Sequence, residues 1–205
     1  MNGVSAPFGF RPVRTMSGAP MAEAQNKYAI AGGYATAIYT GDPVIMLSDG
    51  TIGIGVAGSP GLGIFAGCHY ELATPQANGN SFIASPIWPA SQTVKTGTVV
   101  EAMVIDSPDM VFEVQETDAA GAAGTPLALA DRNLNINFLI VAGNAATGQS
   151  KVSINNASEN TTITLNMKIL DIAPFPSGIN PVGNFAVWLV TWNNHLFKSG
   201  GTTGL

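Results

Sequence analysis

Residues 185–192 read FAVWLVTW, and this short segment is the most informative part of the sequence for the fold. Successive side chains of an extended strand point to opposite faces. Trp188, Val190 and Trp192 therefore share one face, and phenylalanine, valine and leucine share the other. A strand that is apolar on both faces is covered on both faces. It is either central in a β-sandwich or covered by a neighbouring subunit, so these three residues are candidates for an oligomer interface.

The segment TITLNMKI, residues 162–169, shows the other common pattern of β-structure. Ile163, Leu165, Met167 and Ile169 alternate with threonine, asparagine and lysine. A period of two is typical of an antiparallel strand with one buried face and one face in water. The sequence therefore predicts a strand over residues 162–169.

Turn signals and further apolar runs extend this β-pattern through the chain. Residues 43–48 and 51–56 flank Asp49-Gly50, which predicts a hairpin with a type I′ turn. Asn78-Gly79 predicts a second turn of the same kind. Further strands are expected in the runs 99–105, 110–115 and 134–140.

Helical signals are few. Residues 125–131 predict one short helix, with Thr125 as its N-cap and Pro126 in its first turn. No segment keeps a period of 3.6 residues over three turns. The expected fold class is all-β and mainly antiparallel, with little helix: a β-sandwich, a jelly roll or a small barrel.

The first 26 residues differ from the rest, because they hold prolines and glycines without strand-length alternation. They are expected to form an extended N-terminal arm, followed by one β-rich domain over residues 27–205. The Gly/Ala-rich residues 118–125 mark a possible seam within that domain. Such an arm is either a flexible terminus or a segment that docks on a partner. Because aromatic and arginine side chains anchor many interfaces, the candidate partner-binding residues are Phe8, Phe10, Arg11, Pro12 and Arg14.

Charge and composition exclude several classes of function. The 205 residues carry a net charge of −5, and eight lysines and arginines are too few for a phosphate-binding surface. Only 10% of the residues are charged, which suggests that partners cover much of the surface. No secretory signal and no apolar run of about 20 residues is visible, so we expect synthesis in a cytoplasm and no membrane partner.

No motif in the sequence predicts catalysis, a cofactor or a metal. Residues 53–58 match G-x-G-x-x-G, but Pro60 and further glycines follow where a dinucleotide site needs a helix. Cys68 and His69 are neighbours in the sequence; in a strand they point to opposite faces, so they cannot form a nucleophile and its base locally. His195 is the other histidine, and no zinc-ligand spacing links these residues.

Residues 101–118 contain six acidic residues, and no basic residue lies among them. Three interpretations are open: a solvated acidic face, an electrostatic partner for the basic arm of a neighbouring copy or for a basic patch on another protein, and a carboxylate pair for glycoside hydrolysis. The acids are Glu101, Asp106, Asp109, Glu113, Glu116 and Asp118.

The order of several short segments resembles the head decoration (cement) proteins of tailed bacteriophages, particularly short-tailed phages. None of these segments carries chemistry by itself, and the resemblance rests on their order and spacing over most of the chain. The segments are Phe8–Val13, Ser17–Pro20, Gly41–Val44, Asp109–Glu116, Asn160–Thr162 with the following residues to Ile169, Trp188–Val190 and Asn193–His195.

This resemblance implies a non-enzymatic, β-rich structural protein on the outer surface of the virion capsid. Such proteins bind the mature shell as dimers or trimers and clamp neighbouring subunits of the major capsid protein together. The arm would then be a capsid-docking element. The alternative is a receptor- or glycan-binding module of the virion, with Trp88, Trp188 or Trp192 as a platform for a sugar ring.

Overall fold

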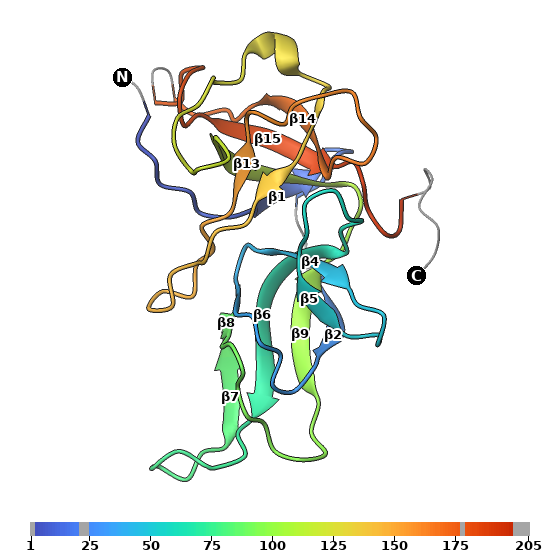
Figure 1. Cartoon of the computed structure of the whole chain (residues 1–205), viewed down its shortest axis with the longest axis vertical. Helices are drawn as coiled ribbons and strands as arrows, with labels where there is room; N and C mark the ends of the chain where they lie inside the picture. Colours follow the sequence, from blue (N-terminus) through green and yellow to red (C-terminus); the bar gives the residue numbers. More distant parts are fainter. Residues whose placement is uncertain (1–2, 21–24, 177–178, 199–205) are drawn as a thin grey trace.

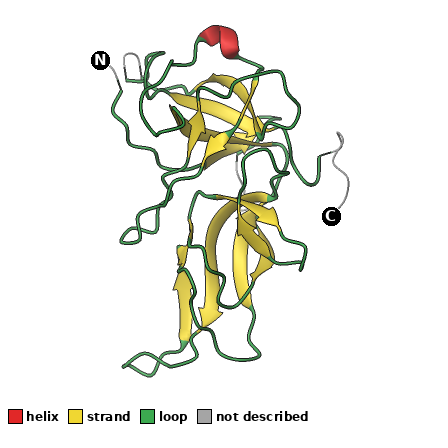
Figure 2. Ribbon diagram, viewed as in Figure 1, coloured by secondary structure: helices red, strands yellow, loops and turns green. Residues whose placement is uncertain are grey.

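The regular secondary structure of the chain is almost entirely β-strand, as its alternating sequence pattern predicts (Figure 2). A computed structural model describes residues 3–20, 25–176 and 179–198. Within these ranges the only helix is one 3₁₀ turn, η1 (Leu129–Asp131), and no described helix is long and apolar enough to cross a membrane. The strands form two larger sheets that follow one another along the long axis of the molecule (Figure 1).

The upper sheet in Figure 1 has seven strands and curls into a nearly closed barrel. Its path runs β11-β14-β15-β10-β13-β12, with β1 beside β10. The two ends of this path, β11 and β12, are separated in the sequence by Asn137 alone, which brings them together. The strands are β1 (Arg11–Thr15), β10 (Met110–Thr117), β11 (Asn135–Ile136), β12 (Phe138–Leu139), β13 (Ser153–Asn155), β14 (Met167–Ile172) and β15 (Val187–Trp192).

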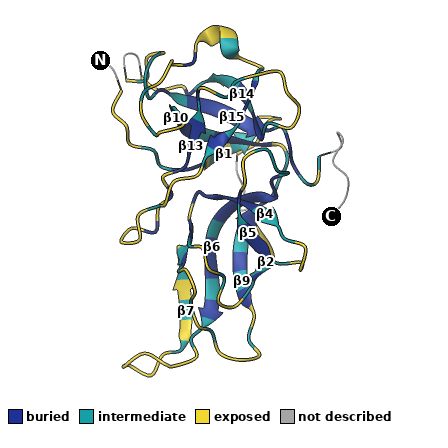
Figure 3. Cartoon of the chain, in the orientation of Figure 1, coloured by how far each residue is buried: buried dark blue, intermediate teal, exposed yellow. Residues whose placement is uncertain are grey.

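Strand β15 lies in the centre of the upper sheet, between β10 and β14 (Figure 3). Trp188, Val190 and Trp192 are fully buried and fill the core inside the curled sheet. Leu189 packs on the opposite face against Val111. Both faces of the strand are thus covered by the chain itself. The prediction that Trp188, Val190 and Trp192 lie at an oligomer interface is therefore wrong, because a side chain buried in its own core cannot contact a second subunit.

The lower sheet follows the path β2-β9-β6-β4-β5. Strand β7 pairs with residues 68–71 of β6, beyond the residues of β6 that pair with β4. A separate pair of short strands, β3 and β8, contributes Ile38 and Trp88 to the same core. The strands are β2 (Asn26–Ile30), β3 (Ile38–Tyr39), β4 (Pro43–Met46), β5 (Ile52–Ile54), β6 (Gly63–Glu71), β7 (Phe82–Ser85), β8 (Ile87–Trp88) and β9 (Val100–Ile105).

The strand predicted over residues 162–169 begins only at Met167. Residues 162–166 form turns, and Ile163 is exposed. The reason lies at the end of β15, where the amide nitrogen Nδ2 of Asn193 donates to the carbonyls of Ile163 (2.9 Å) and Leu165 (2.7 Å). These side-chain hydrogen bonds satisfy backbone groups that a neighbouring strand would otherwise pair.

Both predicted hairpin turns form, but with a different geometry. A type I′ turn needs positive φ at two successive residues, and only Gly50 (φ 80°) and Gly79 (φ 83°) have it. The N–H of Gly50 donates to the carbonyl of Leu47, and the N–H of Leu47 donates to Thr51. This arrangement is a type I turn followed by a left-handed glycine, the usual three-residue hairpin loop.

The predicted helix over residues 125–131 shrinks to the single turn η1. Thr125 does not act as its N-cap. The N–H of Leu127 instead donates to the buried carboxylate of Glu116 (2.8 Å), and the N–H of Ala128 donates to Asp131 (2.7 Å). A side chain of β10 therefore holds this segment in an extended form up to Ala128.

The chain passes from the upper sheet to the lower sheet between β1 and β2, and it returns to the upper sheet after β9, at residues 106–109, and not within residues 118–125. Two groups of hydrogen bonds join the sheets at this junction, which we call the waist. On one side, Thr40 donates to Gly148 and accepts from Ser150, both at 3.0 Å. On the other side, the amide of Asn166 accepts from the Gly58 N–H (2.8 Å) and donates to the Ser59 carbonyl (2.7 Å). Clamps on both sides of the waist fix the orientation of one sheet on the other.

Candidate partner-binding surfaces

The N-terminal segment is a strand of the upper sheet and not a free arm. Strand β1 pairs antiparallel with β10, so that Arg11 lies opposite Glu113 and Thr15 opposite Met110. The register shifts between Pro12 and Arg14, which marks a bulge. Because β2 belongs to the lower sheet, the predicted arm of residues 1–26 contributes to both sheets; residues 1–2 and 21–24 lie outside the described ranges.

Phe10 is part of the upper core, contrary to its predicted role in docking. Only 2% of the residue is exposed. Its ring meets those of Phe112 (5.8 Å between centroids) and Phe138 (6.2 Å) edge to face. Its N–H donates to the carbonyl of Gly41 at the waist (2.9 Å). A buried side chain with these contacts stabilises the fold and is not available to a partner.

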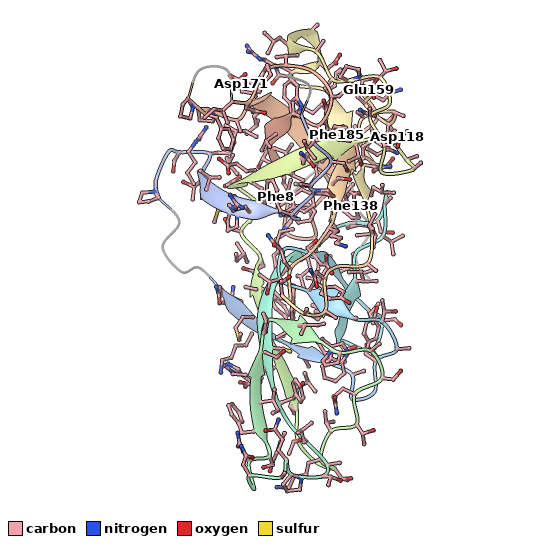
Figure 4. All side chains as sticks on the ribbon, turned by 90° about the vertical axis from the view of Figure 1, so that its left-hand side faces the viewer. Phe8, Asp118, Phe138, Glu159, Asp171 and Phe185 are labelled. Atoms are coloured by element: carbon pink, nitrogen blue, oxygen red, sulfur yellow. The ribbon has the colours of Figure 1, made fainter. Side chains whose placement is uncertain are left out.

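The other four candidate residues of this segment are at least partly accessible. The guanidinium of Arg11 stands 4.6 Å above the ring of Phe8, which is labelled in Figure 4, and lies 3.9 Å from the carboxylate of Glu113. Pro12 is half-buried, and Arg14, also half-buried, donates to the neighbouring carbonyl. Phe8 and Arg11 thus form a small accessible pair, and its arginine is already ion-paired with Glu113 of the same chain.

Gln115 joins the first described residues to the loop before β15. Its Oε1 accepts from the N–H of Ala6 (2.8 Å), and its Nε2 donates to the carbonyls of Val4 (3.0 Å) and Phe185 (2.9 Å). Phe185 has φ 62°, a conformation that bulky residues rarely adopt. The buried amide of Gln115 thus hydrogen-bonds to the backbone of the strained residue Phe185 and to the backbone of the N-terminal segment.

Beside Gln115 lies the first exposed apolar surface, which we call the N-terminal surface. A cavity of about 180 Å³ opens between Gly3 and the loop before β15. Val4 is 78% exposed at its rim. Among the described residues that line the cavity, none is charged. The exposed apolar residues of this surface are Val4, Phe175 and Ile179.

The second apolar surface, the distal surface, lies at the lower end of the molecule, where β7 forms an edge (Figure 3). Phe82 is 56% exposed and Val99 is 65% exposed. The ring of His69 lies 5.6 Å from the ring of Phe82. These side chains line a groove of about 200 Å³ on the outer face of the lower sheet, together with Glu71 and Glu101.

Both carboxylates of the distal surface are ion-paired. Lys95 lies 2.6 Å from Glu71, and Lys27 lies 2.9 Å from Glu101. Hydrogen bonds from these lysines lower the pKa of each carboxyl group. The groove therefore combines apolar walls with charges that cancel. The sequence did not predict this groove, because the pattern FIAS of residues 82–85 occurs in exposed edge strands and in buried strands alike.

The acidic residues of 101–118 do not act as one group. Glu101 pairs with Lys27, and Glu113 lies 3.9 Å from Arg11 of the same chain. Asp106 accepts from the hydroxyl of Tyr28 (2.5 Å), which raises the pKa of that hydroxyl, although burial is the larger cause. Asp118 caps its own turn, and Glu116 is buried. The chain's own β1 thus supplies the basic partner of Glu113.

The single cysteine and the two histidines are separated. Cys68 is buried, and burial raises the pKa of its thiol to about 12. His69 points to the opposite, outer face. His195 is buried at the waist, and burial lowers its pKa to about 4. Among residues 3–20, 25–176 and 179–198, no three His, Cys, Asp or Glu side chains are placed to hold a metal ion.

Trp88 is also buried in the chain, as Trp188 and Trp192 are. Its indole N–H donates to the carbonyl of Tyr34 (3.2 Å), and its ring packs against Tyr70. None of the three tryptophans presents a face on which a sugar ring stacks. Gly53 lies in β5, Gly55 follows the strand and Gly58 lies in a turn, so no helix begins here as a dinucleotide site would need.

Comparisons with known proteins were negative. The chain matches no protein family, no curated protein and no solved structure. Its function is therefore inferred from its own surfaces. The N-terminal surface and the distal surface both expose large apolar side chains, and they lie on different sheets.

Proposed function

We propose that this chain is a capsid decoration protein, a structural virion protein that binds the outside of a mature phage shell as a homo-oligomer. In this role it cements neighbouring subunits of the major capsid protein. One observation carries the proposal: large apolar side chains are exposed at both ends of an elongated body whose two sheets are clamped together. Such a body is suited to contacting two neighbours at once.

The exposed residues lie far apart on the fold. Leu129 is 47% exposed on η1, at the upper end of the molecule (Figure 2). Phe82 and Val99 are exposed at the lower end. Burial of apolar surface contributes roughly 25 cal/mol per Å². Contacts at both ends, repeated over many copies on a shell, add up to strong attachment although each one is small.

The waist supports a bridging role, because a cement must keep its two contact surfaces at a fixed distance. Asn166 and Asn194 of the upper half both bond to the loop at Gly58. The opposite clamp at Thr40 is independent of them. A body held on two sides resists bending more than one joined by a single linker.

The ordered segments that resemble phage decoration proteins, and the low fraction of charged residues, favour the same function. The direct test is the copy number of the chain in purified virions, measured by quantitative mass spectrometry against the major capsid protein. One copy per shell subunit, or a simple fraction of that, would support a shell-wide cement. A few dozen copies or none would contradict it.

The distal surface gives a sharper test. The double variant Phe82→Ser with Val99→Ser should weaken binding to purified shells by about a hundredfold, since two large apolar side chains contribute roughly 1.5 kcal/mol each on burial. Cosedimentation with shells measures this effect. The control is Val56→Ser, which removes a half-exposed valine near the waist. Equal losses in both variants would argue against the distal surface as the contact.

Receptor or glycan binding is the alternative function, and the groove beside Phe82 is its best location. An exposed aromatic ring next to the carboxylates of Glu71 and Glu101 combines a stacking face with hydrogen-bond acceptors. A glycan array probed with the purified protein tests it. Hits that disappear in Phe82→Ser would favour this function over shell binding.

A further inference from the structure

Strand β7 has a free edge. Its residues, Phe82–Ser85, lie antiparallel to β6, with Glu71 opposite Phe82 and Cys68 opposite Ser85. Among the described residues, no strand and no isolated bridge pairs with the other edge of β7. The strand lies at the side of the lower half of the molecule (Figure 1). Such an edge presents backbone donors and acceptors with which a further strand can pair.

A hydrogen bond at the base of β7 shows which backbone groups face this free edge. The N–H of Leu72 donates to the carbonyl of Ser81 (2.8 Å), so these two residues form a hydrogen-bonded pair. Opposed residues of antiparallel strands alternate between hydrogen-bonded and non-hydrogen-bonded pairs. The backbone groups of Ile83 therefore point to β6, and those of Phe82 and Ala84 point to the free edge.

The free edge of β7 lacks the features that usually protect a sheet edge, which are charged residues, proline and bulges. Strand β1, which also pairs with a single strand, has all three: Arg11, Pro12 and a register shift before Arg14. Strand β7 has none of them. Residues 72–94, which contain β7, include no Asp, Glu, Lys, Arg or His, although the chain carries a net charge of −5.

We propose that a second copy of this chain occupies the free edge, with the two β7 strands paired antiparallel about a two-fold axis at Ile83. This pairing names the contact of the homo-oligomer in the proposed function and rests on it. Phe82 of each copy lies opposite Ala84 of the other. Each of these two pairs exchanges two hydrogen bonds, because the backbone groups of both residues point outward.

The ends of β7 favour this register over its neighbours. A register shifted in one direction would need Asn80, whose N–H donates to Asn78 (3.0 Å) and whose carbonyl accepts from Gln76 (2.9 Å). A shift in the other direction would need Pro86, which has no N–H to donate. The register centred on Ile83 uses the outward backbone groups that remain.

The side chains of β7 are complementary to themselves in this register. Phe82 and Ala84 both lie on the outer face and are exposed. The small side chain of Ala84 leaves room for the large ring of Phe82 of the other copy. The half-buried Ile83, which packs on the lower core, meets its own counterpart in a non-hydrogen-bonded pair, where side chains approach most closely.

Electrostatics favour a second copy over a charged partner. Like charges directly opposite one another destabilise paired strands, and a two-fold axis places each residue near its own copy. The acids of the adjacent groove, Glu71 and Glu101, are ion-paired with lysines of the same chain. A strongly basic or acidic strand of another protein would find no counter-charge in residues 72–94. Because Val99 still faces outward, pairing joins two distal surfaces into one.

Sedimentation equilibrium of the purified chain, without shells, tests the pairing. The wild type should form a dimer in equilibrium with the monomer. Ala84→Pro removes the outward N–H of residue 84 from both copies, and with it two of the four hydrogen bonds. The dissociation constant should rise about thirtyfold. The matched control is Ala84→Ser, which keeps the N–H and should change the dissociation constant by about threefold or less.

Hydrogen exchange of the wild type gives a second measurement, which does not depend on the folding of a variant. The amide of Ala84 should become protected as the protein concentration rises through the dissociation constant. The amide of Ile83 is bonded to β6 and should be protected at every concentration. This contrast between neighbouring residues follows from the pairing and not from a general change in stability.

Three outcomes would overturn the proposal: a wild type that stays monomeric up to about 1 mM, a trimer or larger closed assembly, and a dimer that Ala84→Pro does not weaken. Protection of Ala84 only after shells are added would also overturn it, because a shell strand would then occupy the edge. Cosedimentation with shells separates the two proposals. A monomer that binds shells refutes the pairing alone, and a dimer that does not bind them refutes the cement function alone.

Discussion

Replacing Phe10 by alanine should destabilise the protein by about 3–5 kcal/mol, the range for truncating a fully buried phenylalanine. The ring fills space between Phe112 and Phe138, which belong to strands on different parts of the curled sheet. The cavity left behind cannot collapse easily, because those neighbours are themselves buried. Urea unfolding followed by tryptophan fluorescence measures the loss, since Trp188 and Trp192 lie in the same core.

The matched control is Phe8→Ala, two residues earlier. The Phe8 ring is half-exposed, and its described ring contact is with the guanidinium of Arg11. Its removal should cost about 1 kcal/mol or less, as expected for an exposed cation–π contact. Equal destabilisation by both substitutions would show that the segment from Phe8 to Arg11 does not pack as described.

This pair also shows the limit of the sequence as a guide to the candidate site. The pattern of aromatic and arginine residues marks Phe8 and Phe10 equally. They are separated only by their contacts with β10 and β12, which lie more than a hundred residues further along the chain. Composition does not encode such distant partners, so one of the two is core and the other is surface.

The fold itself was easier to predict, because alternation is a local property. The central strand with two covered faces, the hairpin around Gly50 and the apolar face of β10 all follow from a period of two. The prediction failed over residues 162–166, where the period is as clear. There, side chains from the end of β15 replace a strand partner, and no local pattern announces them.

The exposed distal surface had no sequence signal for a related reason. Phe82 and the buried Phe65 are both aromatic residues of β-strands. Their difference is that β7 has a neighbour on one side only, and β6 lies between β9 and other strands. The order of strands in a sheet depends on long-range pairing, so an exposed apolar residue at a sheet edge is recognised only from the structure.

Gly61→Ala should cost about 3 kcal/mol, at the upper end of the usual range for forcing an extra methyl group into a packed core. A Cβ at this position would overlap the ring of Trp192. The ring cannot retreat, because Trp192 is fully buried and packs against Phe112 (6.3 Å) and His195 (5.3 Å). The backbone is equally fixed, since Gly61 donates to the carbonyl of Asn194 (3.0 Å) and accepts from the N–H of Leu196 (2.8 Å).

A neighbouring glycine separates this effect from backbone strain. Gly58 has φ 82° and open space around its Cα, so Gly58→Ala meets no atom but adopts an unfavourable conformation. It should cost about 1 kcal/mol. Gly61 has no positive φ, and its requirement is space alone. Urea unfolding of both variants measures the difference. If Gly61→Ala is no worse than Gly58→Ala, the loop at residues 58–61 does not press on Trp192, and the clamp on that side of the waist is looser than its hydrogen bonds imply.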